Sequence, residues 1–96
     1  MHLPVSEIKK LLKNWHFYKA CISSSKDDTE LGRKLEKIEK AVSMLDDVSS
    51  TIIKKHYFEN TEMDIVINLV FMSRPGVYKR LNKALAEVSF LIANGA

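Results

Sequence analysis

Residues 61–93 read TEMDIVINLVFMSRPGVYKRLNKALAEVSFLIA, and they contain the clearest helical pattern of the chain. Apolar residues recur every three or four positions on both sides of a polar break at Ser73, which is typical of two amphipathic helices. Ser73 is a favourable N-cap residue, and Pro75 and Gly76 fall in the first turn of the second helix, where a missing amide hydrogen costs little. Asn94-Gly95 then ends that helix. The pattern therefore predicts a short helix, a tight break and a longer helix.

The longer helix is expected to have two different faces. The apolar face consists of Val77, Leu81, Ala84, Leu85 and Val88. The opposite face carries Ser73, Arg74, Tyr78, Lys79, Asn82 and Lys83. All four charged residues between positions 73 and 83 are basic, namely Arg74, Lys79, Arg80 and Lys83. Such a local cluster matters more for nucleic-acid affinity than the net charge of +3, although a run of this kind can also be a solvated helix face.

Three further helices are expected before this stretch. Residues 5–22 carry the apolar stripe Ile8, Leu11, Trp15, Tyr18 and Ile22. A second helix, capped by Asp28 or Thr29 and running to about residue 45, carries Leu31, Leu35, Ile38, Val42 and Leu45. Two stripes joined by a polar loop predict an antiparallel helical hairpin or a dimerising pair of helices.

The third helix is expected to begin at the Asp46-Asp47 capping site, to run through Tyr57 and to end at Glu59-Asn60. Thr61, with Asp64 three residues on, resembles a capping box that opens the short fourth helix, which carries Ile65, Val66, Leu69 and Val70. No strand-like alternation persists. The fold class predicted is all-α, with an N-terminal helical hairpin (residues 1–45, for packing or dimerisation) followed by a three-helix helix-turn-helix unit (residues 46–96).

A helix-turn-helix unit places the opening of its second motif helix in the major groove of DNA. The DNA-binding residues predicted on this basis are Ser73, Arg74, Pro75, Gly76, Tyr78, Lys79, Arg80, Asn82 and Lys83. We assign base or phosphate contacts to Arg74 and Lys79, and phosphate contacts to Arg80 and Lys83. Free backbone amides at residues 73–76 offer a further phosphate contact. Tyr78 either packs on the DNA or lies partly buried against the preceding helix.

Residues 61–88 resemble the C-terminal helix-turn-helix of bacterial sigma factors, their region four. The resemblance is carried by Ser73-Arg74, Val77, Lys83-Ala84-Leu85 and Val88, together with the lead-in at residues 45–58 that ends in Tyr57-Phe58. The run SRPGVYKRL at residues 73–81 is similar to small phage regulators of the ArpU type, which control late phage transcription. The resemblance covers about half the chain and implies a DNA-binding transcription regulator of bacterial or phage origin. The inter-helix turn of the family usually holds a glycine, whereas this chain has Val70-Phe71-Met72.

Two other functions use the same fold. One is an interaction module that binds RNA polymerase or another regulator without reading DNA, and the other is a small-terminase-like DNA packaging protein. An enzyme is not expected, because the pairs His16–Cys21 and His56–Glu59 lack a third partner. We also expect no cofactor and no metal.

The amino-acid composition indicates the class of protein and the cellular compartment. Hydrophobic residues make up 46% of the 96 and charged residues 28%, which is ordinary globular composition. A single cysteine, Cys21, forms no internal disulfide, and no apolar run is long enough to span a membrane, so a cytoplasmic protein is expected. Trp15 and Tyr18 lie on the first stripe, which favours core or dimer packing over base stacking. Since so short a chain buries a modest core, a homodimer through the N-terminal helices is expected.

Overall fold

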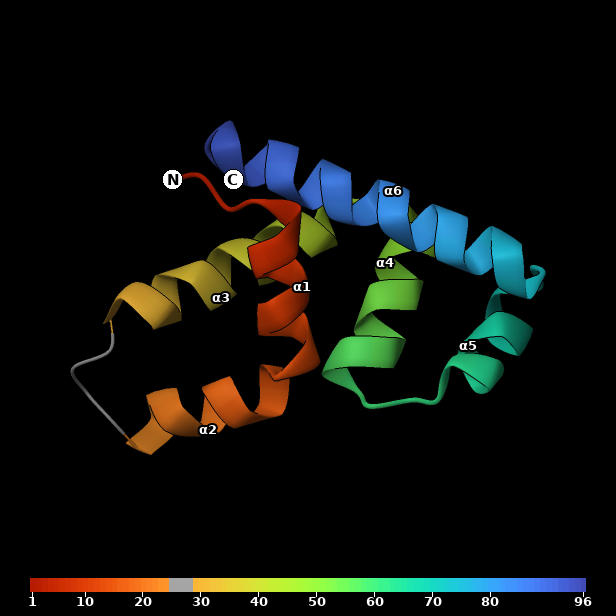
Figure 1. Cartoon of the computed structure of the whole chain (residues 1–96), viewed down its shortest axis with the longest axis horizontal. Helices are drawn as coiled ribbons and strands as arrows, with labels where there is room; N and C mark the ends of the chain where they lie inside the picture. Colours follow the sequence, from red (N-terminus) through yellow and green to blue (C-terminus); the bar gives the residue numbers. More distant parts are fainter. Residues whose placement is uncertain (25–28) are drawn as a thin grey trace.

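The computed structural model describes residues 1–24 and 29–96, and the side chains of residues 1–23 and 30–96. Those residues form six α-helices, a π-helical turn and no strand, so the predicted all-α class is confirmed (Figure 1). The elements are α1 (Val5–Lys13), α2 (Trp15–Ser24), α3 (Thr29–Ser43), α4 (Asp47–Ile53), η1 (Lys54–Phe58), α5 (Met63–Val70) and α6 (Arg74–Ala93).

Helix α6 is the element against which most of the others pack. Figure 1 shows it running along the molecule, with α1 and α3 near its end, α4 under its middle and α5 near its beginning. Its buried face is Val77, Leu81, Ala84, Leu85, Val88 and Ile92, which confirms the predicted apolar face. Neither α6 nor any other helix in the described ranges is both long and apolar enough to cross a membrane.

The predicted single helix over residues 5–22 is wrong, because the chain turns at Asn14 and continues as α2. The Asn14 side chain donates a hydrogen bond to the carbonyl oxygen of Lys10 (3.0 Å), and its backbone leaves the helical region at φ −113° and ψ 28°. The turn brings the Trp15 ring onto Phe58 of η1, with a centroid separation of 4.5 Å. The stripe is therefore divided between two helices, and the N-terminal segment is three helices rather than a simple hairpin.

Two predicted caps are confirmed. The Asp46 carboxylate accepts the Ser49 amide hydrogen at the start of α4, and the Ser73 hydroxyl oxygen accepts that of Gly76 at the start of α6. The side chains of the predicted caps of α3, Asp28 and Thr29, lie outside the described residues.

The capping box predicted at Thr61 is wrong. Asn60 adopts a positive φ of 56°, which lets the Thr61 amide donate to the carbonyl oxygen of Lys55 (2.8 Å) and terminate η1. Helix α5 begins two residues later, after Glu62, with no side-chain cap. The third helix also differs in its last turn, which is π-helical.

One hydrophobic core cluster includes side chains from Leu3 to Ala96. The Ser89 hydroxyl donates to the carbonyl oxygen of Leu3 (2.6 Å), which fixes the N-terminal segment against the end of α6. Figure 1 accordingly shows the two termini close together. Both halves of the chain contribute to this core, and the division at residue 45 stays a prediction.

Candidate nucleic-acid interface

The opening of α6 is held by a compact cap. The Gly76 amide donates to the Ser73 hydroxyl oxygen (3.2 Å), and the Val77 amide donates to the Ser73 carbonyl oxygen (2.9 Å). A Cβ at position 76 would lie 3.1 Å from the Ser73 hydroxyl oxygen and 3.4 Å from the Met72 methyl carbon. Glycine at this position therefore lets the cap close without crowding. Pro75, directly before this glycine, lies in the first turn of α6, as the sequence predicts.

The nine residues predicted to bind DNA lie together at this end of α6. Seven are exposed, namely Ser73, Arg74, Pro75, Tyr78, Lys79, Asn82 and Lys83. Gly76 and Arg80 are half-buried. The structure thus agrees with the predicted polar face, and the DNA-binding role of these residues stays a prediction.

Lys79 and Lys83 lie one helical turn apart beside a shallow hollow. The hollow has a volume of about 330 Å³ and is lined by Met72, Gly76, Lys79, Arg80 and Lys83. Within the described ranges, neither lysine is in an ion pair. Three cationic side chains therefore converge on one hollow, and two of them are available to an anion.

The two arginines at the α6 opening pair with aspartates from other helices. Arg74 pairs with Asp64 of α5, and Arg80 Nη1 lies 3.2 Å from Asp46 Oδ2 at the start of α4. No acid lies between residues 73 and 86, and the partners Asp64 and Asp46 are 10 and 34 residues away from their arginines along the chain. Sequence reasoning assigned both aspartates to helix capping alone and missed the ion pairs. The positive charge of the opening is accordingly smaller than four bases indicate.

The Asp46 carboxylate is held in its ionised form. A hydrogen bond from the backbone amide of Ser49 lowers its pKa below the ordinary value of 3.8, and the positive charge of Arg80 lowers this pKa further. Ser49 is itself buried, which fixes the amide that makes this bond. Asp46 therefore carries a full negative charge at neutral pH.

Tyr78 lies at the edge of the α6 opening, with part of its ring exposed. Burial raises the pKa of the neighbouring Tyr57 hydroxyl, and interaction with Tyr78 raises it further. Tyr78 thus lies near Tyr57 of η1 while it remains exposed, and its predicted packing on DNA or against the preceding helix stays a prediction.

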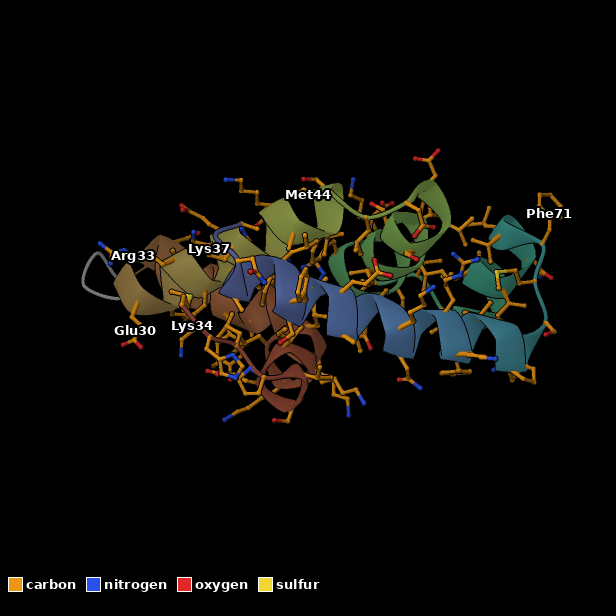
Figure 2. The ribbon with its side chains drawn as sticks, turned by 90° about the horizontal axis from the view of Figure 1, so that it is seen from above. Glu30, Arg33, Lys34, Lys37, Met44 and Phe71 are labelled. Carbon is orange, nitrogen blue, oxygen red and sulfur yellow. The ribbon has the colours of Figure 1, made fainter. Side chains whose placement is uncertain are left out.

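Three exposed apolar side chains, Ile65, Leu69 and Phe71, lie at the other side of the α5–α6 turn, and we call them the α5 apolar strip. Ile65 and Leu69 are 50% and 49% exposed, and Phe71 is 95% exposed. Figure 2 shows the Phe71 side chain at the far end of the molecule. The buried residues of α5 are instead Met63 and Val66. Helical periodicity in the sequence grouped Ile65 and Leu69 with Val66 as apolar residues of one helix. It did not reveal that Ile65 and Leu69 are exposed while Val66 is buried.

Aromatic residues of α2 are mostly used in packing. Trp15 is 5% exposed and belongs to the core, which confirms the packing prediction for this residue. The Lys19 ammonium lies 5.3 Å from the centroid of the Trp15 ring and pairs with Glu39. Phe17 remains exposed. The apolar surface proposed for a dimer is therefore smaller than the sequence stripe indicates.

The two histidines considered as reactive groups line a hollow of about 180 Å³ between α2 and η1. The ring Nδ1 of His56 lies 3.1 Å from the carbonyl oxygen of Thr61, while Glu59 pairs with Lys55 (3.0 Å) rather than with the histidine. No group of three or more His, Cys, Asp or Glu side chains in residues 1–23 and 30–96 is arranged to hold a metal ion.

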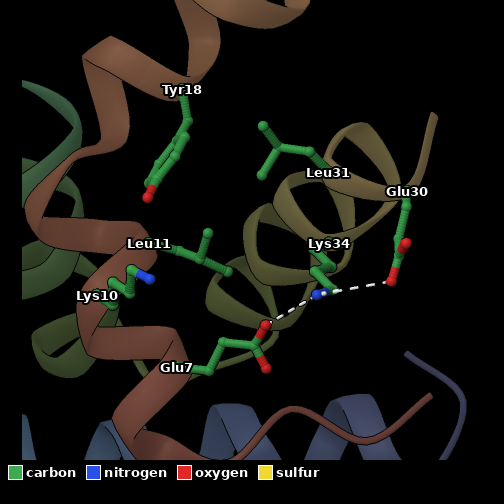
Figure 3. Close-up of a pocket in the computed structure, with 7 residues that line it drawn as sticks. All are labelled: Glu7, Lys10, Leu11, Tyr18, Glu30, Leu31 and Lys34. Carbon is green, nitrogen blue, oxygen red and sulfur yellow. Dashed lines mark hydrogen bonds and ion pairs between the residues drawn. The ribbon is translucent and has the colours of Figure 1, made fainter. Parts of the chain in front are cut away.

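Another hollow, of about 250 Å³, lies between α1, α2 and α3 (Figure 3). The Lys34 ammonium donates to Glu7 (2.8 Å) and lies 3.7 Å from Glu30, and these interactions, that with Glu7 first, raise the pKa of Lys34. Tyr18, Leu11 and Leu31 supply the apolar part of the lining. The charged groups Lys34, Glu7 and Glu30 of this hollow are thus paired with one another.

Comparisons with protein-family models, with curated proteins and with solved structures found no match. The resemblance to sigma region four and to ArpU-type regulators therefore stays a prediction carried by residues 45–88.

Proposed function

We propose that this chain binds double-stranded DNA through the opening of α6 and acts as a transcription regulator of bacterial or phage origin. The observation that carries the proposal is the pair Lys79 and Lys83, which are exposed, one turn apart and outside any ion pair in the described ranges. Phosphate neutralisation by such lysines supplies most of non-specific DNA affinity. Asn82, exposed between them in sequence, offers both a donor and an acceptor to a base edge.

In this proposal α5 and α6 form the helix-turn-helix pair, with the break at residues 71–73 between them. The exposed face of α6 enters the major groove, because its opposite face is occupied by the core residues Val77, Leu81 and Leu85. Lys79 and Lys83 contact phosphates beside the hollow, and Arg80 joins them there. Arg74 contacts a base or a phosphate once it leaves Asp64.

The test is a comparison of two double lysine variants in titrations with a labelled DNA duplex. We expect Lys79→Ala/Lys83→Ala to weaken binding at least about tenfold and to make the salt slope of log affinity shallower by about 2, since two phosphate contacts are lost. Lys9→Ala/Lys13→Ala is the matched control, because it removes two exposed lysines four residues apart on α1. Both variants change only exposed side chains, so each should alter stability by less than about 0.5 kcal/mol per site. Equal losses in the two variants would show that the α6 opening is not the DNA-binding face.

A homodimer is part of the proposal. The exposed Phe17 ring on α2 and the exposed Met44 side chain directly after α3 are apolar groups of the described N-terminal segment that remain for such a contact. A dimer would present two copies of α6 to half-sites about 34 Å, or a multiple of that distance, apart. With about three phosphate contacts in each copy, the salt slope should be roughly −5 for a dimer and roughly −3 for a monomer. Light scattering that gives a monomer, together with the shallower slope, would remove the dimer and leave DNA binding intact.

The α5 apolar strip favours a second candidate, the interaction module that binds RNA polymerase or another regulator. Ile65 and Leu69 lie four residues apart on α5, and Phe71 follows beyond its end. Large exposed apolar side chains that gather at one place commonly mark a protein contact. This candidate gains if the lysine variant binds DNA as the wild type does.

A small-terminase-like packaging protein would bind DNA through the α6 opening, as in the first proposal. A gel shift separates specific from general binding: DNA from the neighbourhood of the chain's own gene is the probe, and a scrambled sequence is the competitor.

A further inference from the structure

One carboxylate oxygen at the start of α4 accepts two hydrogen bonds. Asp46 Oδ2 lies 3.2 Å from the Ser49 amide nitrogen and 3.2 Å from Arg80 Nη1. The first bond caps α4, and the second draws the Arg80 guanidinium toward the acid from the hollow that Arg80 also lines. The same aspartate therefore serves the fold and acts on the cationic surface of α6.

We propose that Asp46 competes with DNA phosphate for the guanidinium of Arg80 and thereby limits the DNA affinity of the α6 opening. The inference rests on the proposed function and concerns the regulation of that same surface. Both partners are partly exposed, with 37% of the Arg80 side chain and 49% of the Asp46 side chain accessible. An ion pair this exposed is weak, so a phosphate that accepts two parallel hydrogen bonds from the guanidinium can replace the carboxylate.

The exchange leaves the fold intact. When Arg80 moves to a phosphate, Asp46 keeps the Ser49 amide hydrogen bond and α4 keeps its cap. The carboxylate also stays ionised, because the Ser49 amide continues to lower its pKa. Arg74 and Asp64 form a second arginine–aspartate pair at the same opening. Both arginines of the α6 opening are thus paired with acids, whereas Lys79 and Lys83 are not. The ion pairs weaken the binding of DNA in general, and they leave each arginine able to bind a well-placed phosphate.

Two neighbouring aspartates provide the test. Asp46→Asn and Asp47→Asn each remove one negative charge from the start of α4, and Asp47 is exposed without an ion pair in the described ranges. General electrostatics change equally in the two variants, so the difference between them isolates the pairing with Arg80. Asparagine is also a good N-cap, so Asp46→Asn should keep α4.

The measurement is fluorescence anisotropy with a short fluorescein-labelled duplex of mixed sequence at low salt. We expect Asp46→Asn to bind about two- to fivefold more tightly than Asp47→Asn. In an Arg80→Gln background the two variants should bind equally, because no guanidinium remains to be released. If Asp46→Asn lowers the melting temperature strongly, Asp46→Ser replaces it, since serine caps a helix and is too short to reach Arg80.

The outcomes separate the inference from the proposed function. Equal affinities of Asp46→Asn and Asp47→Asn, with wild-type binding that still depends on Lys79 and Lys83, overturn the competition and leave the DNA interface standing. A wild-type protein that does not bind the duplex even at low salt overturns both.

Discussion

The backbone of Phe71 lies in the left-handed region, at φ 55° and ψ 42°, and its ring is almost entirely exposed. This conformation costs a residue with a side chain about 1–2 kcal/mol, whereas glycine adopts it freely. The sigma-factor resemblance predicts a glycine in this turn, whereas this chain has a phenylalanine in the left-handed conformation there. So exposed a ring gains little packing to offset this cost, and it forms part of the α5 apolar strip.

We predict that Phe71→Gly raises the free energy of unfolding by about 0.5–1 kcal/mol, because relief of the left-handed strain exceeds the added entropy of an unfolded glycine. Phe90→Gly is the matched control, since Phe90 is 66% exposed but lies within the regular helix α6. It should lower stability, because glycine disfavours a helix interior. Urea denaturation of both variants is the measurement, and a loss of stability in Phe71→Gly comparable with that in Phe90→Gly would contradict this reading of the turn.

Local signals predict the residues that cap helices, and they do not predict distant ion pairs. Asp46 and Ser73 are identified from the sequence because a cap depends on amides three residues away. The pairing of Arg80 with Asp46 depends on how α4 lies against α6, and nothing near either residue indicates it. The candidate site is therefore predictable in its location and not in its net charge.

At the scale of elements, α6 follows its sequence pattern closely and α1 does not. The apolar face of α6 contacts other helices along its length, so the 3.6-residue spacing of apolar residues in the sequence matches the buried face. The stripe over residues 5–22 has the same period, contains no glycine or proline, and still breaks at Asn14. The break allows Trp15 to reach Phe58, a contact between segments more than forty residues apart that no local pattern contains.

We predict that Leu85→Ala lowers the free energy of unfolding by about 2–5 kcal/mol. Leu85 lies on the buried face of α6, and truncation of its side chain leaves a cavity in the core. Leu69→Ala is the same substitution on the exposed strip of α5 and should cost under about 1 kcal/mol. Thermal melts of the two variants check the assignment of faces. Equal destabilisation by both variants would mean that the α5 apolar strip is buried in solution.

At the scale of the whole molecule, one core connects the N-terminal and C-terminal segments. Its buried side chains come from Ile8 and Leu35 as well as from Ile52 and Leu85, and the Trp15–Phe58 stack joins α2 to η1. A single core of this kind favours cooperative unfolding. The division at residue 45 is predicted from the two apolar stripes before it and from the sigma-factor resemblance that begins there. Neither feature reports which helices pack together.

We predict that the two segments unfold in one transition. Trp15 is the sole tryptophan of the chain, and its fluorescence reports the contact between α2 and η1. Far-UV circular dichroism reports the helices of the whole chain. The two signals should give the same urea midpoint, and two separated transitions would instead support independent units at residues 1–45 and 46–96.

The central claim is that the opening of α6 contacts DNA. It is tested most directly by titrating the ¹⁵N-labelled protein with a short duplex and following its amide resonances by NMR. We expect the largest chemical-shift changes on residues 73–83, with a smaller change at Asp46 as Arg80 leaves it. Changes confined to α1 and α3, or shifts centred on Ile65, Leu69 and Phe71 with none on α6, would contradict it.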